Sequence, residues 1–242
     1  MSANDIHSAM VLAAGLGTRM RPITDHTPKP LVKVAGETLL DRALDAAVAS
    51  GVRRAVVNVH HLADLIETHL IGRDDIKTVV SDERAELLDS GGGIAHALPH
   101  LGDAPFLILN ADTFWREGDG RNVDRLAAAF DDGTDFALLL ASHEQAIGFG
   151  GRGDFFMDGN GHLSRRGTAD AAPWIYAGAI LAHPRAFRDA PQGAFSINVL
   201  FDRAIATGRL KGVPMRGLWL HVGTPDAIEE AERALAAYER AA

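Results

Sequence analysis

Residues 10–22 read MVLAAGLGTRMRP, and this stretch decides the fold. An apolar run at 10–13 predicts a buried strand, and the two glycines that follow, Gly15 and Gly17, predict a loop. Because glycine lets backbone amides approach a ligand closely, such a loop suits phosphate oxygens. An open α/β sheet binds ligands beyond the carboxyl ends of its strands, which is where this loop would lie. The glycines alone are equally compatible with a simple tight turn.

Outward from this stretch, the first 140 residues alternate short apolar runs with amphipathic segments. We expect further strands at 55–59, 78–80, 106–109 and 136–141, and helices at 38–50, 62–70, 94–98 and 123–130. The third helix should open after the glycines at 91–93 and stop before Pro99. This order predicts an α/β fold, Rossmann-like, with a mostly parallel central sheet and helices on both faces.

The second half predicts a small mixed β extension. Residues 148–153 are glycine-rich and should form a loop, and two short strands should flank the turn at 158–161. We expect strands at 174–182 and 218–222, and helices at 195–206 and 225–242, the last with Thr224 as its N-cap. No composition break demands a linker. We therefore expect a single domain over residues 1–242, with parts at about 1–145 and 146–242.

Composition excludes several classes of function. The 242 residues contain no cysteine, which excludes disulfides, thiolate metal sites and a cysteine nucleophile. The net charge of −8 and the 6% aromatic content argue against nucleic acid and anionic membranes as partners. No apolar run approaches a membrane span, and residues 1–8 do not resemble a signal peptide. We expect a cytoplasmic globular protein, whose oligomeric state the sequence does not indicate.

Cations nevertheless gather around the glycine loop, where Arg19, Arg21 and Lys29 fall within eleven residues. No Walker-type GxxxxGK[ST] sequence is present, and Met20 and Pro22 do not fit a dinucleotide-binding helix. The segment up to Pro30 is therefore expected to be a long irregular loop, and its charges favour a function for it.

The motifs GLGTRMRP at 15–22 and TPKP at 27–30 resemble the signature of the sugar-1-phosphate nucleotidyltransferases. The similarity spans nearly the whole chain, because GGG at 91–93, NAD at 110–112, YAG at 176–178 and VGTP at 222–225 follow in the family's order. The short length and RGDF at 152–155 most resemble the bacterial N-acetylmuramate-1-phosphate uridylyltransferases of cell-wall recycling. The resemblance implies a nucleotide-diphospho-sugar transferase fold, with a nucleotide-binding part at about 1–145 and a sugar-binding part at about 146–242.

The implied reaction joins a sugar 1-phosphate, here N-acetylmuramate 1-phosphate, to a nucleoside triphosphate, here UTP. The phosphate attacks the α-phosphorus and pyrophosphate leaves, so catalysis consists mainly of positioning and charge neutralisation. By resemblance, Arg19 and Lys29 are the catalytic cations, and the stretch at 86–92 meets the base. The implied nucleotide-binding residues are Ala14, Gly15, Gly17, Thr18, Arg19, Asp82 and Gly92.

For the sugar, the resemblance implies contacts from Asn110, Asp154 and Gly178. It also implies a metal site at Asp112, which follows an apolar strand, with Mg²⁺ as the expected ion. His221 stands where the family usually has an aspartate. It could still bind the metal, which would favour Mn²⁺, could contact a phosphate, or could have no ligand role.

Two other functions stay open at this point. The chain could be a mannose-1-phosphate guanylyltransferase or another pyrophosphorylase that forms nucleotide sugars. It could also be an inactive regulatory protein that binds nucleotide sugars, an idea that the histidine at 221 keeps open. The cations at 19 and 29 and the carboxylate at 112 argue against inactivity.

Overall fold

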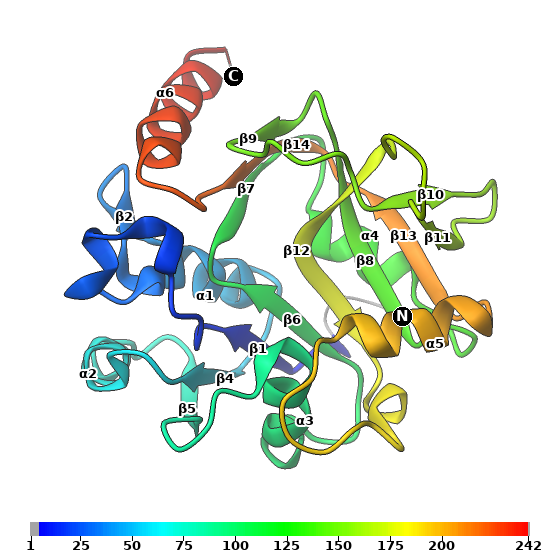
Figure 1. Ribbon diagram of the computed structural model, residues 1–242, viewed down its shortest axis with the longest axis horizontal. Coiled ribbons are helices and arrows are strands. Elements are labelled where there is room, and N and C mark those ends of the chain that lie inside the picture. The colour runs from blue at the N-terminus through cyan, green and yellow to red at the C-terminus, as the bar shows by residue number, and fades with distance from the viewer. Residues whose placement is uncertain (1–4, 242) are drawn as a thin grey trace.

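The fold is that of a computed structural model, which describes residues 5–241. A nine-stranded sheet forms its centre, and Figure 1 shows its strands running across the molecule. Strand β1 (Ser8–Leu12) lies between β4 (Arg54–Val59) and β6 (Phe106–Asn110), parallel to both, and β5 (Lys77–Asp82) continues the sheet beyond β4. This half of the sheet confirms the expected parallel strands.

The rest of the sheet is mixed. Strand β12 (Trp174–Ala182) is antiparallel to β6 on one side and to β8 (Phe136–Ser142) on the other. Strand β13 (Leu210–Pro214) then pairs in parallel with β8. The expected hairpin at 158–161 is present, formed by β10 (Phe155–Met157) and β11 (Leu163–Arg165), and it joins β12 through Phe155. The α/β class with a small mixed β extension is thereby confirmed.

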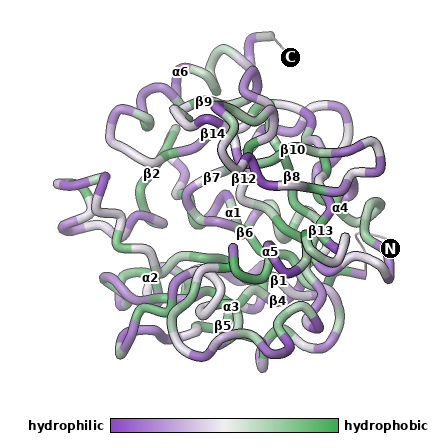
Figure 2. The backbone as a smooth tube through the Cα atoms, turned by 45° about the vertical axis from the view of Figure 1, so that its right-hand side comes forward, coloured by the Kyte–Doolittle hydropathy of each residue, from purple (hydrophilic) through white to green (hydrophobic). Residues whose placement is uncertain are grey.

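Both faces of the sheet are covered because its strands are apolar on both sides. In β1, Ala9 and Val11 face one core while Met10 faces the other, as successive side chains of a strand must. The first core is closed by α1 (Leu39–Ala49), α2 (Ala63–Ile71) and α4 (Asn122–Ala129). The second is closed by α3 (Asp89–Leu101) and α5 (Asn198–Ala206). Figure 2 shows hydrophobic stretches concentrated inside the molecule and hydrophilic ones at its periphery.

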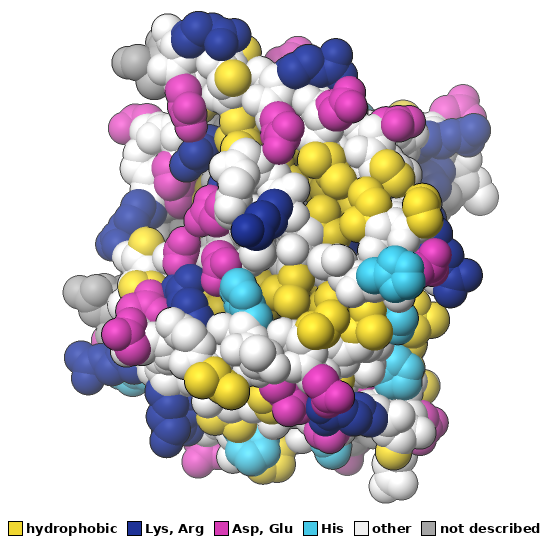
Figure 3. Space-filling model, turned by 90° about the vertical axis from the view of Figure 1, so that its left-hand side faces the viewer, with side chains coloured by type: hydrophobic (Ala, Val, Ile, Leu, Met, Phe, Trp, Pro, Cys, Tyr) yellow, Lys and Arg dark blue, Asp and Glu magenta, His cyan; other side chains and the backbone are white. Residues whose placement is uncertain are grey.

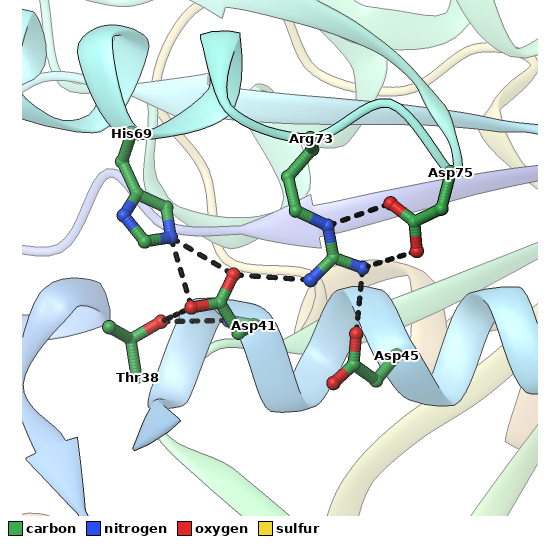
Figure 4. A network of polar contacts seen from close by, with 6 residues as sticks. All are labelled: Thr38, Asp41, Asp45, His69, Arg73 and Asp75. Carbon is green, nitrogen blue, oxygen red and sulfur yellow. Dashed lines mark hydrogen bonds and ion pairs between the residues drawn. The ribbon is translucent and has the colours of Figure 1, made fainter. Parts of the chain in front are cut away.

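Helix α1 begins where Thr38 accepts a hydrogen bond from the Asp41 amide at 3.0 Å, a regular N-cap. Polar contacts then join α1 to α2 and the segment after it (Figure 4). Asp41 is paired with His69 of α2 at 2.9 Å, and Arg73 binds Asp41, Asp45 and Asp75. These contacts fix the relative position of two helices that cover the same face of the sheet.

A third core lies beside the sheet. It packs α6 (Asp226–Ala241) against a small sheet of β7 (Thr113–Glu117), β14 (Gly217–His221) and β9 (Ala146–Ile147). The hairpin of β2 (Lys33–Val34) and β3 (Glu37–Thr38) packs there too. Figure 1 shows α6 at the opposite end of the molecule from β5. The segment before α1 and the segment after β6 therefore pack on the same hydrophobic core.

The structure differs from the sequence expectations mainly at α3. This helix contains both the glycines 91–93 and Pro99, instead of starting after the former and ending before the latter. These helical positions require glycine because neighbours lie close to the backbone: a Cβ on Gly91 would lie 2.4 Å from the Phe195 ring. Beyond Pro99, which lacks one helix hydrogen bond, Leu101 still packs into the second core, and its carbonyl accepts a bond from Ser8.

Other differences are smaller. Strands β2, β3, β7, β9 and β13 have no counterpart among the expected strands, α5 begins at Asn198 and not at 195, and α6 begins at Asp226, one residue after the expected start. Its expected end at residue 242 lies outside the described residues. Across residues 5–241, no helix has the length and apolar character needed to cross a membrane.

Candidate functional site

A cavity of about 560 Å³ opens at the carboxyl ends of β1, β4 and β6. This is the edge at which open α/β sheets bind ligands. Eight of the residues singled out in the sequence line it: Ala14, Gly15, Gly17, Thr18, Arg19, Lys29, Asn110 and Asp112. Residues far apart in the chain thus meet at the point where the glycine loop leaves the central strand.

The glycine loop is shaped by close packing at Gly17. This residue has φ +63°, and a Cβ there would lie 2.9 Å from Thr24 and 3.0 Å from Lys29. Its carbonyl accepts a hydrogen bond from the buried Thr24 hydroxyl at 2.8 Å. Gly15, in contrast, faces open space, so its backbone is free to meet a ligand. Only glycine at 17 allows the loop to fold against the segment that carries Lys29.

Lys29 and Asp112 form an ion pair at the floor of the cavity, with Nζ 2.9 Å from Oδ2. The Lys29 side chain is 11% exposed, whereas the Asp112 side chain is 32% exposed. Burial opposes ionisation of Asp112, but Lys29, His221 and Arg19 outweigh it and hold the pKa of this carboxyl below its usual value. A carboxylate charged at neutral pH therefore stands at the end of β6.

His221 approaches this carboxylate from the neighbouring small sheet. Strands β14 and β7 pair His221 with Thr113, and the Val222 amide donates to the Asp112 carbonyl at 3.0 Å. The imidazole stacks on Trp219, and its Nδ1 lies 3.1 Å from the Gly148 carbonyl. Because a carbonyl only accepts, Nδ1 carries the proton in the neutral ring and leaves Nε2 as an acceptor.

These two side chains fit a divalent cation only in part. Within residues 5–241, no group of three or more histidine, cysteine or acidic side chains could hold a metal ion. Mg²⁺ needs few protein ligands, since it retains waters and shares the phosphates of its substrate. Asp112 alone meets that requirement, and a neutral imidazole suits Mn²⁺ better than Mg²⁺.

The other predicted residues do not line the cavity. Asp82 is exposed, and the Arg84 amide and guanidinium, the latter 2.6 Å away, hold its pKa below the usual value. Gly92 is buried in α3, where a Cβ would lie 2.4 Å from the Gly193 carbonyl. Gly178 is buried in β12 with φ +81°, packed against Thr113. Each of these positions has a structural partner in the fold.

Asp154 is linked to the cavity indirectly. Its carboxylate accepts a hydrogen bond from the Tyr176 amide at 2.9 Å, and the Tyr176 hydroxyl donates to Asn110 at 3.5 Å. Burial and the negative charge of Asp112 raise the pKa of Tyr176, so the hydroxyl remains a donor at neutral pH. The predicted sugar side therefore meets the cavity at Asn110.

The side of the cavity next to β5 and α3 was predicted only in part. From the stretch at 86–92, the residues Leu87, Asp89 and Ser90 line the cavity, whereas sequence reasoning missed Asn58 and Glu83. The detectable signal was Asn58, a polar residue inside the apolar strand run at 55–59. A polar side chain in a buried strand needs a partner, and the partner here is Glu83, 2.7 Å away. Since the pair is 25 residues apart, no local pattern reveals it.

Comparisons with known proteins bear on the family and the fold of the chain. Residues 9–232 match the MobA-like NTP transferase domain. The N-acetylmuramate alpha-1-phosphate uridylyltransferase of Caulobacter vibrioides is 47% identical over 94% of this chain and 96% of that protein. The Neisseria meningitidis protein of the same name is 31% identical over 96% of this chain and 99% of its own length. The crystal structure of HddC from Yersinia pseudotuberculosis complexed with GMP-PN shares the fold. The match covers 95% of this chain and 100% of the HddC chain, with a TM-score of 0.77 at 22% sequence identity.

Proposed function

Because the chain belongs to the MobA-like NTP transferase domain family, whose relatives here are sugar-1-phosphate nucleotidyltransferases, we propose that it joins UTP to N-acetylmuramate 1-phosphate. The products are UDP-N-acetylmuramate and pyrophosphate. The choice of sugar and base rests on the name shared by the Caulobacter and Neisseria relatives, which are 47% and 31% identical and match over nearly their full length. The reaction class rests on the cavity itself.

The observation that carries the proposal is the meeting of Arg19, Lys29 and Asp112 around a glycine loop. The sugar phosphate is already an anion at neutral pH, so the transfer needs no general base. Its oxygen forms a bond to the α-phosphorus as the bond to pyrophosphate breaks, and the obstacle is repulsion between anions. The loop amides and Arg19 would bind the triphosphate, and Arg19 would neutralise the departing pyrophosphate.

Lys29 would hold the two reactants together. Its ammonium lies at Asp112, on the cavity floor, where it can exchange this carboxylate for oxygens of the α-phosphate and the sugar phosphate. The flanking residues Pro28 and Pro30 restrict its backbone, so little freedom is lost when the contact forms. Lys29 thereby positions both phosphates for attack.

Asp112, with His221 near it, would hold a divalent ion. The ion supplies neutralisation of charge on the α-phosphate. We further propose that residues 1–145 bind the nucleotide and residues 146–242 the sugar, with Asn110, Asp154 and Gly178 at the boundary. Asp82 and Gly92, which lie outside the cavity, would act on the base only through the segment that joins them.

The test is pyrophosphate release measured with UTP, CTP, GTP and dTTP against a panel of sugar 1-phosphates. We expect the largest kcat/KM with UTP and N-acetylmuramate 1-phosphate. Lys29→Met and Asp112→Asn should each reduce kcat by at least about 100-fold, as for loss of one group that stabilises developing charge. Arg21→Met is the matched control, because this exposed cation of the same loop pairs with Asp25 and does not line the cavity.

Two outcomes would contradict the proposal. A preference for GTP and mannose 1-phosphate would make the chain a guanylyltransferase. Measurable UTP binding without pyrophosphate release from any pair would indicate a regulatory nucleotide-binding protein.

A further inference from the structure

A buried acid with no part in the proposed phosphate chemistry lies at the other end of the cavity. Glu83 follows β5, is 2% exposed, and lines the same cavity as the glycine loop. Within residues 5–241 it has no cationic partner within salt-bridge distance. A buried carboxylate needs compensation, and here it comes from hydrogen-bond donors.

Both carboxylate oxygens of Glu83 are used. Oε1 accepts from the Asn58 side-chain amide at 2.7 Å, and Oε2 accepts from the Leu88 backbone amide at 3.0 Å. Asn58 is itself 3% exposed, and its Oδ1 accepts from the Ala13 amide at 2.7 Å. The four residues form one chain of hydrogen bonds, which we name the 13–58–83–88 relay.

The relay joins the two structural ends of the cavity. Ala13 begins the glycine loop after β1, and Leu88 directly precedes α3, whose first residues Asp89 and Ser90 line the cavity. Close packing holds the middle of the relay in place. A Cβ at Gly93 would lie 2.5 Å from Glu83 Oε1 and 2.9 Å from the Asn58 amide nitrogen.

We propose that Glu83 is a positioning residue that sets the glycine loop and the start of α3 at a fixed separation, so that phosphates and nucleobase are bound together. The proposal rests on the proposed function for the identity of the ligand. The existence of the relay as a coupling between the two segments does not depend on it.

The direction of the hydrogen bonds makes the relay testable. A carboxylate only accepts, so it can serve the Leu88 amide and the Asn58 NH₂ at once. In Glu83→Gln, one acceptor becomes a donor. Whichever way the introduced glutamine and Asn58 then flip, one N–H group faces another. In Asn58→Asp, two carboxylates face each other.

The double variant Glu83→Gln/Asn58→Asp restores every bond. The glutamine oxygen accepts from Leu88, its NH₂ donates to the new carboxylate, and the other oxygen of that carboxylate accepts from Ala13. The net charge equals that of the original pair. A purely volumetric role would not predict this rescue, since each substitution leaves the side chain nearly unchanged in size.

The experiment measures amide hydrogen exchange at Ala13 and Leu88 in the full chain without nucleotide, and the Kd of UTP by calorimetry. We expect each single variant to raise the exchange rate of at least one of these amides by about tenfold or more and to weaken UTP binding by about 10- to 100-fold. The double variant should return both quantities to within about threefold of the original protein. Glu144→Gln, an exposed acid, is the matched control.

Each outcome decides the matter. Unchanged exchange at both amides in both single variants, or a double variant that recovers neither quantity, overturns the relay. Altered exchange with an unchanged UTP Kd leaves only a structural role for Glu83 and overturns positioning. If the original protein binds no UTP, the proposed function fails, while the exchange data still decide whether the two segments are coupled.

Discussion

Gly178 offers a direct test of whether a buried glycine serves the fold or the ligand. It has φ +81° in β12, where the pairing with β8 shifts register between Tyr176 and Ile180. A Cβ there would lie 2.0 Å from Thr113 Oγ1, whereas ordinary contact begins at 3.4 Å, a shortfall of 3.4 − 2.0 = 1.4 Å. Overpacking of this kind destabilises by about 1–3 kcal/mol. The left-handed backbone adds about 1–2 kcal/mol for any residue with a Cβ.

We therefore expect Gly178→Ala to lower the free energy of unfolding by about 2–5 kcal/mol, a large part of a typical stability of about 5–15 kcal/mol. Urea unfolding followed by circular dichroism measures it. Thr113→Ala in the same chain removes the oxygen that clashes, so the double variant should recover the packing part and keep the backbone part. An unchanged unfolding midpoint, with a raised KM for the sugar phosphate alone, would refute this reasoning and assign the Gly178 amide to the ligand.

Two further predictions concern charge. Asp135 binds Arg185 and Arg209, and despite burial these hydrogen bonds hold its pKa below the usual 3.8. Asp135→Asn should cost about 3 kcal/mol of stability at pH 7. Because the folded pKa is lowered, that difference should shrink as the pH falls below about 4, and equal differences in urea unfolding at pH 7 and pH 3 would contradict it. His221→Asp should raise the affinity for Mg²⁺ relative to Mn²⁺, measured by calorimetry, by at least about tenfold, since even groups behind metal ligands change affinity by that much. An unchanged ratio would remove His221 from the metal site.

The parallel half of the fold could be predicted from sequence because its signals are local. The apolar run at 55–59 and the periodic segment at 38–50 each contain their own evidence, and the structure confirms both as β4 and α1. A helix is expected at 94–98, but the full extent of α3 over Asp89–Leu101 could not be predicted, since glycine and proline normally end helices. The ring of Phe195, a residue far along the chain, leaves room only for glycine at position 91, and no local pattern reports this contact.

The candidate site likewise has one part that local sequence signals predict and one part that long-range contacts determine. The end formed by the glycine loop follows from one continuous motif, and the structure brings Gly15, Arg19 and Lys29 to one cavity. The end of the cavity near β5 and α3 depends on contacts between distant segments, such as Asn58 with Glu83. Asp82, which the family resemblance implied as a nucleotide contact, lies outside the cavity, while the adjacent residue Glu83 lines it. Alternation along an extended segment places neighbouring side chains on opposite sides.

The excess of acidic side chains affects how the cations of the chain are distributed. Many cations are held by carboxylates away from the cavity: Arg73 binds three aspartates, and Arg84 binds Asp64, Glu67 and Asp82. On the face in Figure 3, basic and acidic side chains are intermixed and form no broad basic surface. At the cavity, Lys29 and Asp112 cancel each other's charge, which leaves Arg19 to attract an anion from solution. Under the proposed function, Lys29 would add to the neutralisation of a triphosphate by leaving Asp112 for the phosphate oxygens. A cation that then took its place at the carboxylate would favour this exchange, so the ion pair would link phosphate binding to metal binding.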